Sequence, residues 1–224
     1  GLEYEIRSFA KRGNSDSLEP EDYLIHSERY GIPQSRHRVI LLGVLKGTGA
    51  PQHHLLEPVS TPVTVGHAID DLPKIRSKLS KGDSLEAWRH AVQAAPSYLD
   101  GWGLEIESAM IERMQSSVAK ATSTSTGGAF IAQEWLLDRN LGGICQHESR
   151  AHMASDLARY LFAATFAEWR KYSPRLDVFP PKLLPAHHNV QPNDRAGAIP
   201  FKDRFRVQCK NDPAATVVAH IAKD

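Results

Sequence analysis

The sequence predicts a mixed α and β protein, either α+β or a fragment of an α/β sheet with an added domain. Two observations carry this prediction. Apolar residues near both ends alternate or cluster as they do in strands, and apolar residues in the middle repeat at helical spacing. The chain has 224 residues, which suits one large domain or two small ones. Because strand-like sequence lies close to both ends, we expect an excised fragment.

Three strands are expected in the first part of the chain. Residues 2–9 alternate apolar and polar side chains, residues 23–25 form a short strand, and residues 35–45 form the strongest one. Residues 39–44 are almost continuously aliphatic, which predicts that they are buried. A turn sequence, Lys-Asn-Asp-Pro, joins two further expected strands over residues 203–209 and 215–222.

Helices are expected in the middle of the chain, and local sequence indicates where each begins. Thr64 is suited to cap a short helix that ends at Pro73, and Asp83 or Ser84 is suited to cap the next. The last helix has apolar residues on two sides, which predicts deep burial, and Ser155 is its expected N-cap. The four expected helices cover residues 64–72, 84–95, 104–121 and 155–172.

Charge and cysteine content restrict the classes of function. The chain has 27 basic and 26 acidic residues, and its net charge is +1 with neutral histidines. A nucleic-acid-binding surface would therefore have to be a local patch. No apolar run is long enough to cross a bilayer, and the N-terminus has no signal-peptide pattern. Cys145 and Cys209 stand in unrelated contexts, so we expect no disulfide and a reducing cytoplasm.

The chain has no sequence pattern of a metal site or of a self-sufficient catalytic site. Its histidine clusters are His53 with His54, His187 with His188, and His147 and His152 near Cys145. None has the spacing of a closed structural zinc site, and the last cluster would lack a fourth ligand, so no metal is predicted. There is also no P-loop, no G-x-S-x-G or H-E-x-x-H pattern, and neither cysteine has an activating neighbour.

The most informative segment is residues 30–44, Tyr-Gly-Ile-Pro-Gln-Ser-Arg-His-Arg-Val-Ile-Leu-Leu-Gly-Val. Gln34, Arg36 and Arg38 occupy every second position, and alternate residues of a strand share a face. No Asp or Glu lies between residues 32 and 56 to neutralise the arginines locally. One interpretation is an edge strand whose arginines face solvent. The other is a polar site for a phosphate, a carboxylate or the edge of a base, which a planar guanidinium suits.

This segment resembles the Gln-x-Arg-x-Arg segment of the DNA (cytosine-5) methyltransferase family, with the tyrosine, glycines, proline, glutamine and both arginines in place. Two later segments follow in the family's order. Residues 64–73, Thr-Val-Gly-His-Ala-Ile-Asp-Asp-Leu-Pro, resemble its T-V-x-x-A-I-x-D-L-P segment, and residues 204–224 resemble the close of its target-recognition domain. Residues 147–160 resemble bacterial members. The first motif is the sharpest of these.

The resemblance implies an α/β fold class: terminal strands of a Rossmann-like methyltransferase sheet, followed by a mixed, largely helical α+β target-recognition domain. Residues 1–75 would be the C-terminal part of the catalytic domain, and residues 76–224 an incomplete target-recognition domain. Four family segments are absent: the Pro-Cys nucleophile, Glu-Asn-Val, the Gly-rich end of a strand that holds S-adenosylmethionine, and Gly-Asn-x-Val-x-Pro. The parent enzyme would transfer a methyl group from S-adenosylmethionine to C5 of a flipped cytosine. This chain alone is expected to be inactive and to bind no cofactor.

The resemblance also assigns roles to residues. Arg36 and Arg38 would contact the edge of the target base or an adjacent phosphate in the catalytic pocket, and Gln34 would help to organise the strand. Thr216 would contact a phosphate or anchor a loop. Further candidates for contact with double-stranded DNA, each with ordinary surface placement as the alternative, are Arg150, His152, Arg204, Arg206, Lys210 and Lys223.

Two functions remain open at this point. The first is a fragment of a methyltransferase from a bacterial modification system, acting on DNA in the cytoplasm at the nucleoid. The second is a stand-alone, non-catalytic DNA-binding module derived from that family. Three motifs in the family's order disfavour an unrelated α/β domain. No membrane partner is expected, whereas sheet edges left open in a fragment would favour self-association.

Overall fold

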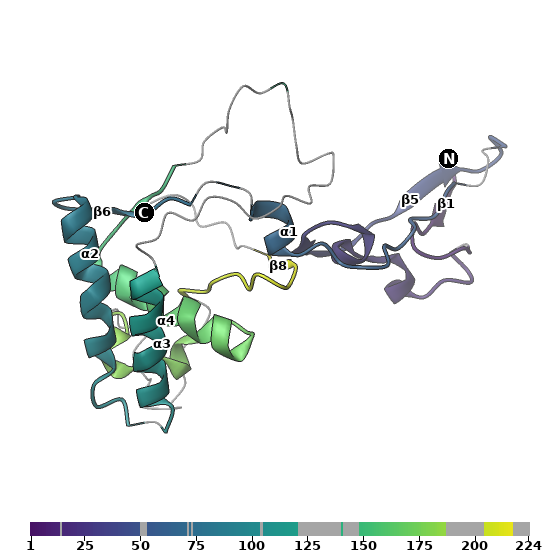
Figure 1. The fold of residues 1–224 in the computed structure, drawn as a ribbon. Coiled ribbons are helices and arrows are strands. Elements are labelled where there is room, and N and C mark those ends of the chain that lie inside the picture. The colour runs from purple at the N-terminus through teal and green to yellow at the C-terminus, as the bar shows by residue number, and fades with distance from the viewer. Residues whose placement is uncertain are drawn as a thin grey trace. The chain divides into compact units, whose positions relative to one another are not determined.

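The computed structural model describes residues 1–13, 15–49, 53–70, 72, 74–103, 105–120, 140, 148–186 and 204–216. These residues form two compact units, coloured by residue number in Figure 1. Unit 1 contains Gly1–Asp70 and the described residues from Lys210 onward. Unit 2 contains the described residues from 72 to 209. The sequence predicted a domain boundary after residue 75, with the C-terminal residues in the second domain. In the structure, residues 210–216 belong to unit 1.

Unit 1 is built from short paired strands. Strand β1 (Tyr4–Arg7) pairs antiparallel with β5 (Leu42–Leu45), and β2 (Leu24–His26) pairs antiparallel with β4 (His37–Val39). Strand β3 (Gln34–Ser35) pairs in parallel with β8 (Ala214–Ala215). The helical turns of this unit are the 3-10 helices η1 (Pro20–Tyr23) and η2 (Ser27–Tyr30) and the α-helix α1 (Val65–Ile69).

The strand expected over residues 35–45 differs from the sequence prediction in two respects. It is divided into parts of β3, β4 and β5, and its aliphatic centre is exposed. Val39, Ile40 and Leu41 expose 62%, 43% and 57% of their surface. Ile40 and Leu41 lie between β4 and β5, outside both strands. The prediction that residues 39–44 are buried is therefore wrong: Gly43 is exposed like this triad, and Leu42 and Val44 are half-buried. The described strands form four two-stranded sheets, and the Rossmann-like sheet stays a prediction.

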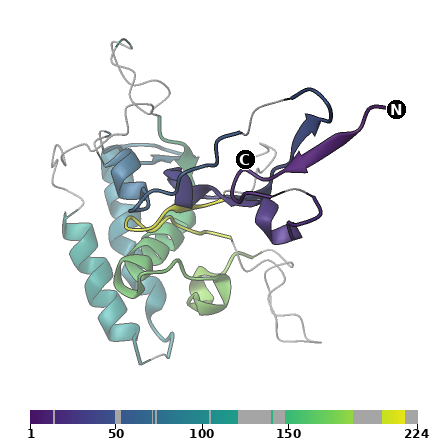
Figure 2. The same cartoon turned by 90° about the vertical axis from the view of Figure 1, so that its right-hand side faces the viewer.

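Unit 2 is largely helical. Its α-helices are α2 (Leu85–Ala94), α3 (Glu107–Lys120) and α4 (Ala154–Arg170), which lie side by side as teal and green ribbons in Figure 2. Its 3-10 helices are η3 (Ala95–Leu99), η5 (Leu176–Val178) and η6 (Pro181–Leu183). One short parallel pair, β6 (Lys78–Leu79) with β7 (Ala151–His152), completes the described elements.

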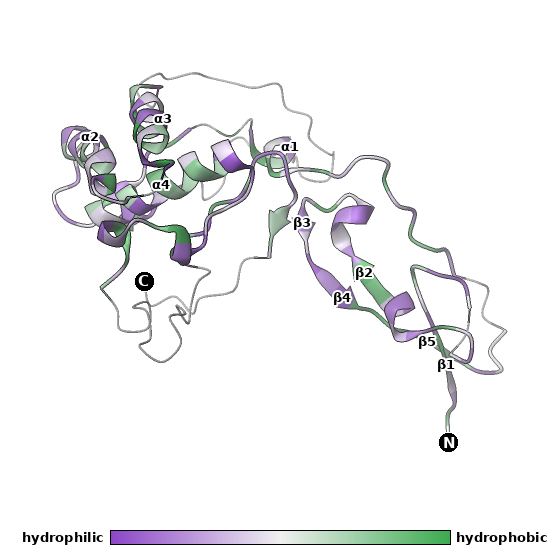
Figure 3. Cartoon of the chain, turned by 90° about the horizontal axis from the view of Figure 1, so that it is seen from below, coloured by the Kyte–Doolittle hydropathy of each residue, from purple (hydrophilic) through white to green (hydrophobic). Residues whose placement is uncertain are grey.

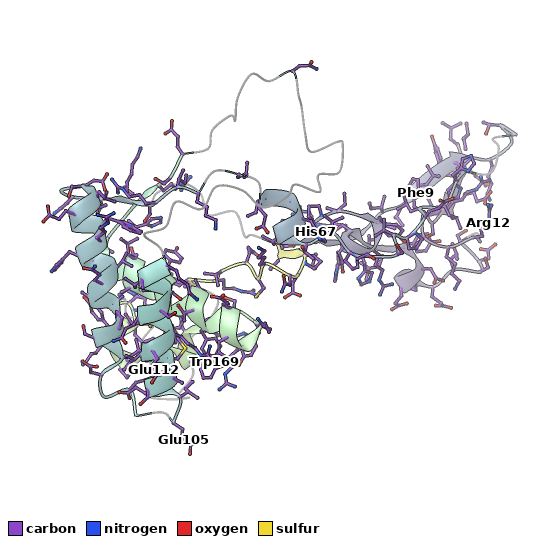
Figure 4. The ribbon with its side chains drawn as sticks, in the orientation of Figure 1. Phe9, Arg12, His67, Glu105, Glu112 and Trp169 are labelled. Atoms are coloured by element: carbon purple, nitrogen blue, oxygen red, sulfur yellow. The ribbon has the colours of Figure 1, made fainter. Side chains whose placement is uncertain are left out.

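Helix α4 organises the core of unit 2, as its two apolar sides predict. Phe162 is fully buried, and its ring meets those of Trp102 and Phe179 edge to face, at centroid distances of 5.5 and 4.9 Å. At the rim, Trp169 of α4 (labelled in Figure 4) carries the guanidinium of Arg113 from α3 at 4.6 Å from the ring centroid. The core residues that α3, η3, η5 and η6 bury completely or almost completely are Met110, Met114, Ala95, Leu99, Leu176 and Leu183.

Two of the three predicted helix caps are present. The Thr64 hydroxyl accepts a hydrogen bond from the backbone of His67 at 3.3 Å, and Ser84 accepts one from the backbone of Ala87 at 3.0 Å. Ser155 is not an N-cap, because α4 begins one residue earlier, at Ala154. The Ser155 hydroxyl instead accepts from Nη1 of Arg159 at 3.2 Å.

The strand expected over residues 203–209 is absent from its described part. Residues 204–209 are irregular, because Phe205 adopts a left-handed backbone conformation with φ of 57°. The Phe205 and Val207 side chains pack against the core of unit 2. The backbone N–H of Val207 donates to the Ser173 hydroxyl at 3.0 Å. Tertiary packing therefore overrides the alternating apolar pattern here.

None of the helices in the described part of the chain has the length and apolar character that a membrane span requires.

A bidentate ion pair fastens the chain just before α2. Nη1 and Nη2 of Arg76 donate to the two carboxylate oxygens of Asp83 at 2.6 and 3.0 Å. The backbone N–H of Leu79 donates to the same carboxylate at 3.0 Å. The Arg76 hydrogen bonds, followed by that from Leu79, lower the pKa of Asp83 from its ordinary 3.8 to about 2.

We predict that Asp83→Asn destabilises unit 2 at neutral pH and that this effect disappears in acid. Because the folded-state pKa of Asp83 is depressed, the carboxylate stabilises the fold above its ordinary pKa of 3.8 and stops doing so as the pH falls toward about 2. The difference in melting temperature between wild type and variant should therefore decrease to zero as the pH falls from 3.8 to about 2. Asp100→Asn, at another exposed aspartate of unit 2, is the control. Equal pH dependence of the two differences would contradict the prediction.

Candidate functional site

The first and third motif segments meet in unit 1, although they lie far apart in the chain. Gln34 and Ser35 pair in parallel register with Ala214 and Ala215. The backbone N–H of Ala214 donates to the carbonyl of Pro33 at 2.9 Å. The Thr216 hydroxyl donates to the carbonyl of Ser35 at 2.7 Å, across 181 positions of sequence. Of the two roles expected for Thr216, this hydrogen bond matches that of an anchor.

The second motif segment joins the same cluster through the first turn of α1. Val65 and Gly66 donate their backbone N–H groups to the carbonyls of Asp212 and Lys210 at 2.9 and 2.8 Å. A side chain at Gly66 would place its Cβ 3.1 Å from the Lys210 carbonyl oxygen, so the absence of a side chain permits this approach. Nζ of Lys210 pairs with Asp70 at 2.6 Å, so this predicted DNA contact already has a carboxylate partner.

The backbone between β3 and β4 is held by Ser27. Its hydroxyl donates to the carbonyl of Gln34 at 2.6 Å and accepts from the N–H of Arg36 at 3.0 Å. Arg36 is therefore at a fixed junction between the two short strands and not within one continuous strand. Gln34 is half-buried, while Arg36 and Arg38 are exposed.

Arg36 and Arg38 have no ion-pair partner among the residues that the structure describes. By contrast, Arg76 and Arg159 each pair with a carboxylate at 2.6 Å. Nη1 of Arg38 donates to the carbonyl of His37 at 2.6 Å. Two exposed guanidiniums on a short, braced stretch of backbone can bind an anion or the acceptor edge of a base without first breaking an ion pair.

The predicted DNA contacts in unit 2 have other surroundings. Arg150 is exposed, and its backbone carbonyl accepts from the N–H of Lys78 at 3.1 Å. His152 is half-buried, with its ring edge to face against Tyr160 at 5.4 Å. Arg206 is exposed and Arg204 half-buried.

The structure does not bring all the predicted residues into one unit. Unit 1 contains Arg36, Arg38, Lys210 and Thr216. Unit 2 contains Arg150, His152, Arg204 and Arg206. The remaining predicted contact, Lys223, lies outside the described residues. So do Cys145, His147, His187 and His188 from the candidate metal ligands.

Sequence reasoning missed a cluster formed by His26, Glu28 and His37. His26 and His37 are direct partners in the β2–β4 register, and β4 is coloured as hydrophilic beside β2 in Figure 3. Nε2 of His37 lies 2.8 Å from Oε1 of Glu28, and Nδ1 of His26 lies 3.7 Å from the same oxygen. The His-x-Glu spacing of residues 26–28 was the only local signal, because the third member depends on strand pairing.

No protein-family model, curated protein or solved structure matches this chain.

We predict that Thr216→Val loosens the junction of the motif segments. The substitution keeps the shape of the side chain but removes the donor to Ser35, which costs about 1 kcal/mol for a typical hydrogen bond. Hydrogen exchange of the Ala214 amide, which donates to Pro33, should accelerate accordingly. Thr216→Ser retains the hydroxyl and is the matched control. Unchanged exchange in the valine variant would show that the hydroxyl anchors nothing.

Proposed function

We propose that this chain is part of a DNA (cytosine-5) methyltransferase, to which it contributes DNA recognition and part of the pocket for the target base. One observation carries the proposal. Two segments that resemble the family, residues 30–44 and 64–73, are each hydrogen-bonded in unit 1 to the third, the described part of 210–224. The local sequence of these segments does not require them to be in contact. Segments inherited from the site of a common ancestor would be expected to be in contact.

In this proposal Arg36 and Arg38 bind the extruded nucleotide. An enzyme that acts on a base within a duplex takes it out of the stack, which brings a carbonyl edge and a phosphate to the protein. Two exposed guanidiniums without ion-pair partners in the described chain suit both groups. Gln34 and Ser27 act on the backbone: β3 pairs with β8, and the Ser27 hydroxyl bridges Gln34 and Arg36.

The exposed aliphatic triad of Val39, Ile40 and Leu41 also supports the proposal. Three adjacent apolar side chains, each more than two-fifths exposed, lie directly after Arg38. Further strands of a catalytic sheet in the parent enzyme would cover them, and burial of such surface stabilises the fold by about 25 cal/mol per Å². In the parent, the arginines would thus stand where the chain enters a buried sheet.

The methyl transfer itself requires groups that this sequence lacks. The parent enzyme would supply the cysteine nucleophile and the residues that hold S-adenosylmethionine, from which the methyl group passes to C5 of the flipped cytosine. The second candidate function is a non-catalytic DNA-binding module derived from the same family. The reading frame around the gene segment separates the two, because only a methyltransferase would encode Pro-Cys upstream and Gly-Asn-x-Val-x-Pro downstream.

We predict that the 224-residue chain does not methylate DNA alone. The measurement is transfer of tritium from methyl-labelled S-adenosylmethionine to a duplex of mixed sequence. No incorporation above that of heat-denatured protein is expected, because the nucleophile segment is absent. Incorporation above this background would overturn the assignment of the chain as the recognition part.

We also predict weak, salt-sensitive binding of the chain to duplex DNA that depends on both arginines. Replacing Arg36 and Arg38 with alanine should weaken binding by roughly tenfold and lower the slope of log affinity against log salt by up to about two. The matched control replaces Lys11 and Lys46, two exposed lysines of unit 1 that are paired with Asp22 and Glu3. It removes the same charge. Equal losses of DNA affinity in the two double variants would show that only net charge matters. That result would contradict the roles assigned to Arg36 and Arg38.

A further inference from the structure

The cluster of His26, Glu28 and His37 has the composition of a metal site. Its members come from β2, the first turn of η2 and β4. His26 and His37 are cross-strand partners, and such partners place their side chains on the same face of a sheet. Their ring centroids are 4.1 Å apart. Strand pairing thus brings two imidazoles beside one carboxylate.

The distances fit a small divalent ion. The three ligand atoms all lie within 4.8 Å of one another. Oε1 of Glu28 is 2.8 Å from Nε2 of His37 and 3.7 Å from Nδ1 of His26. Tetrahedral Zn²⁺ with bonds of about 2.0–2.2 Å places its ligand atoms about 3.3–3.6 Å apart. The two observed separations lie on either side of that value.

The carboxylate of Glu28 is incompletely satisfied in the described structure. Its Oε2 atom is buried and has no hydrogen-bond partner there. Burial acts to raise the pKa of Glu28, but hydrogen bonds from its own backbone N–H and from His37 outweigh this and lower the pKa below its ordinary value. The group is therefore a carboxylate at neutral pH. Among the described residues its ion-pair partners are the two histidines, with no lysine or arginine.

We propose that His26, Glu28 and His37 bind one divalent transition-metal ion, with Zn²⁺ as the best match to two imidazole nitrogens and one carboxylate oxygen. The ion takes the place of the hydrogen bond between Nε2 of His37 and Oε1 of Glu28, and the neutral His37 ring then carries its proton on Nδ1. The His37 side chain is 46% exposed, which gives the ion access from solvent and leaves a fourth position for water. This site does not depend on the proposed function.

Bound metal would fasten β2 to β4 beside the candidate DNA contacts. His37 stands between Arg36 and Arg38 in the sequence, and Ser27, which bridges Gln34 and Arg36, stands between His26 and Glu28. The ion would cross-link the two stretches of backbone that position the arginines. Other described histidines have different partners: a ring nitrogen of His53 lies 2.6 Å from the carbonyl of Ser8, and His152 packs on Tyr160.

The test is calorimetric titration of the full chain, first freed of metal with a chelator, with zinc chloride. The wild type is expected to bind one equivalent, and His26→Ala with His37→Ala to weaken that binding by at least about tenfold. Replacing His54 and His90, two exposed histidines outside the cluster, removes the same number of imidazoles and should leave the affinity unchanged. Wild-type affinity in the first double variant, or no binding by the wild type, would overturn the proposal.

Two further measurements guard against misfolding of the double variant. Glu28→Gln keeps the size of the side chain and removes its charge, so it should weaken zinc binding while the circular dichroism spectrum stays unchanged. Nitrogen NMR of the wild-type histidine rings needs no variant at all. Zinc should shift the ring signals of His26 and His37, and shifts confined to other histidines would refute the site.

Discussion

The pairing of residues 210–216 with the Gln-x-Arg-x-Arg segment and with α1 is the contact on which the organisation of unit 1 depends. It consists of the short parallel pair β3–β8, the backbone bonds from Val65 and Gly66, and the hydroxyl of Thr216. Closing a loop of this length costs chain entropy that local contacts do not repay. Several hydrogen bonds must therefore form together. The absence of a side chain at Gly66 allows the backbone of Lys210 to approach α1.

Around this junction, some polar side chains bond to groups within unit 1, whereas others are exposed and could bind a ligand. Ser27 and Thr216 use their hydroxyls on backbone groups, and Lys210 uses its charge on Asp70. Arg36 and Arg38 are exposed and have no carboxylate partner in the described chain. A flexible side chain on a rigid base loses less entropy on binding than one on a mobile loop. This difference is the physical reason for proposing that the two arginines contact a ligand.

Unit 2 is stabilised differently, by a helical core. Phe162, Leu99 and Met110 are completely buried, and Arg159 closes the layer by donating to the carbonyl of Leu183 and pairing with Asp156. Of the predicted DNA contacts in this unit, His152 packs on Tyr160, whereas Arg150 and Arg206 are exposed.

The four α-helices could be predicted from local sequence. Apolar spacing located α3 and α4, and a cap and a following proline located α2. Thr64 and Ser84 cap helices as their types predict, because periodicity and capping involve residues a few positions apart. Ser155 was expected to be the N-cap of α4, but the N-cap is Met153, two residues earlier. The exposed triad from Val39 to Leu41, the partner of Thr216 and the cluster at Glu28 were decided only by the tertiary structure. Each depends on which distant strand pairs with which, and that choice is non-local.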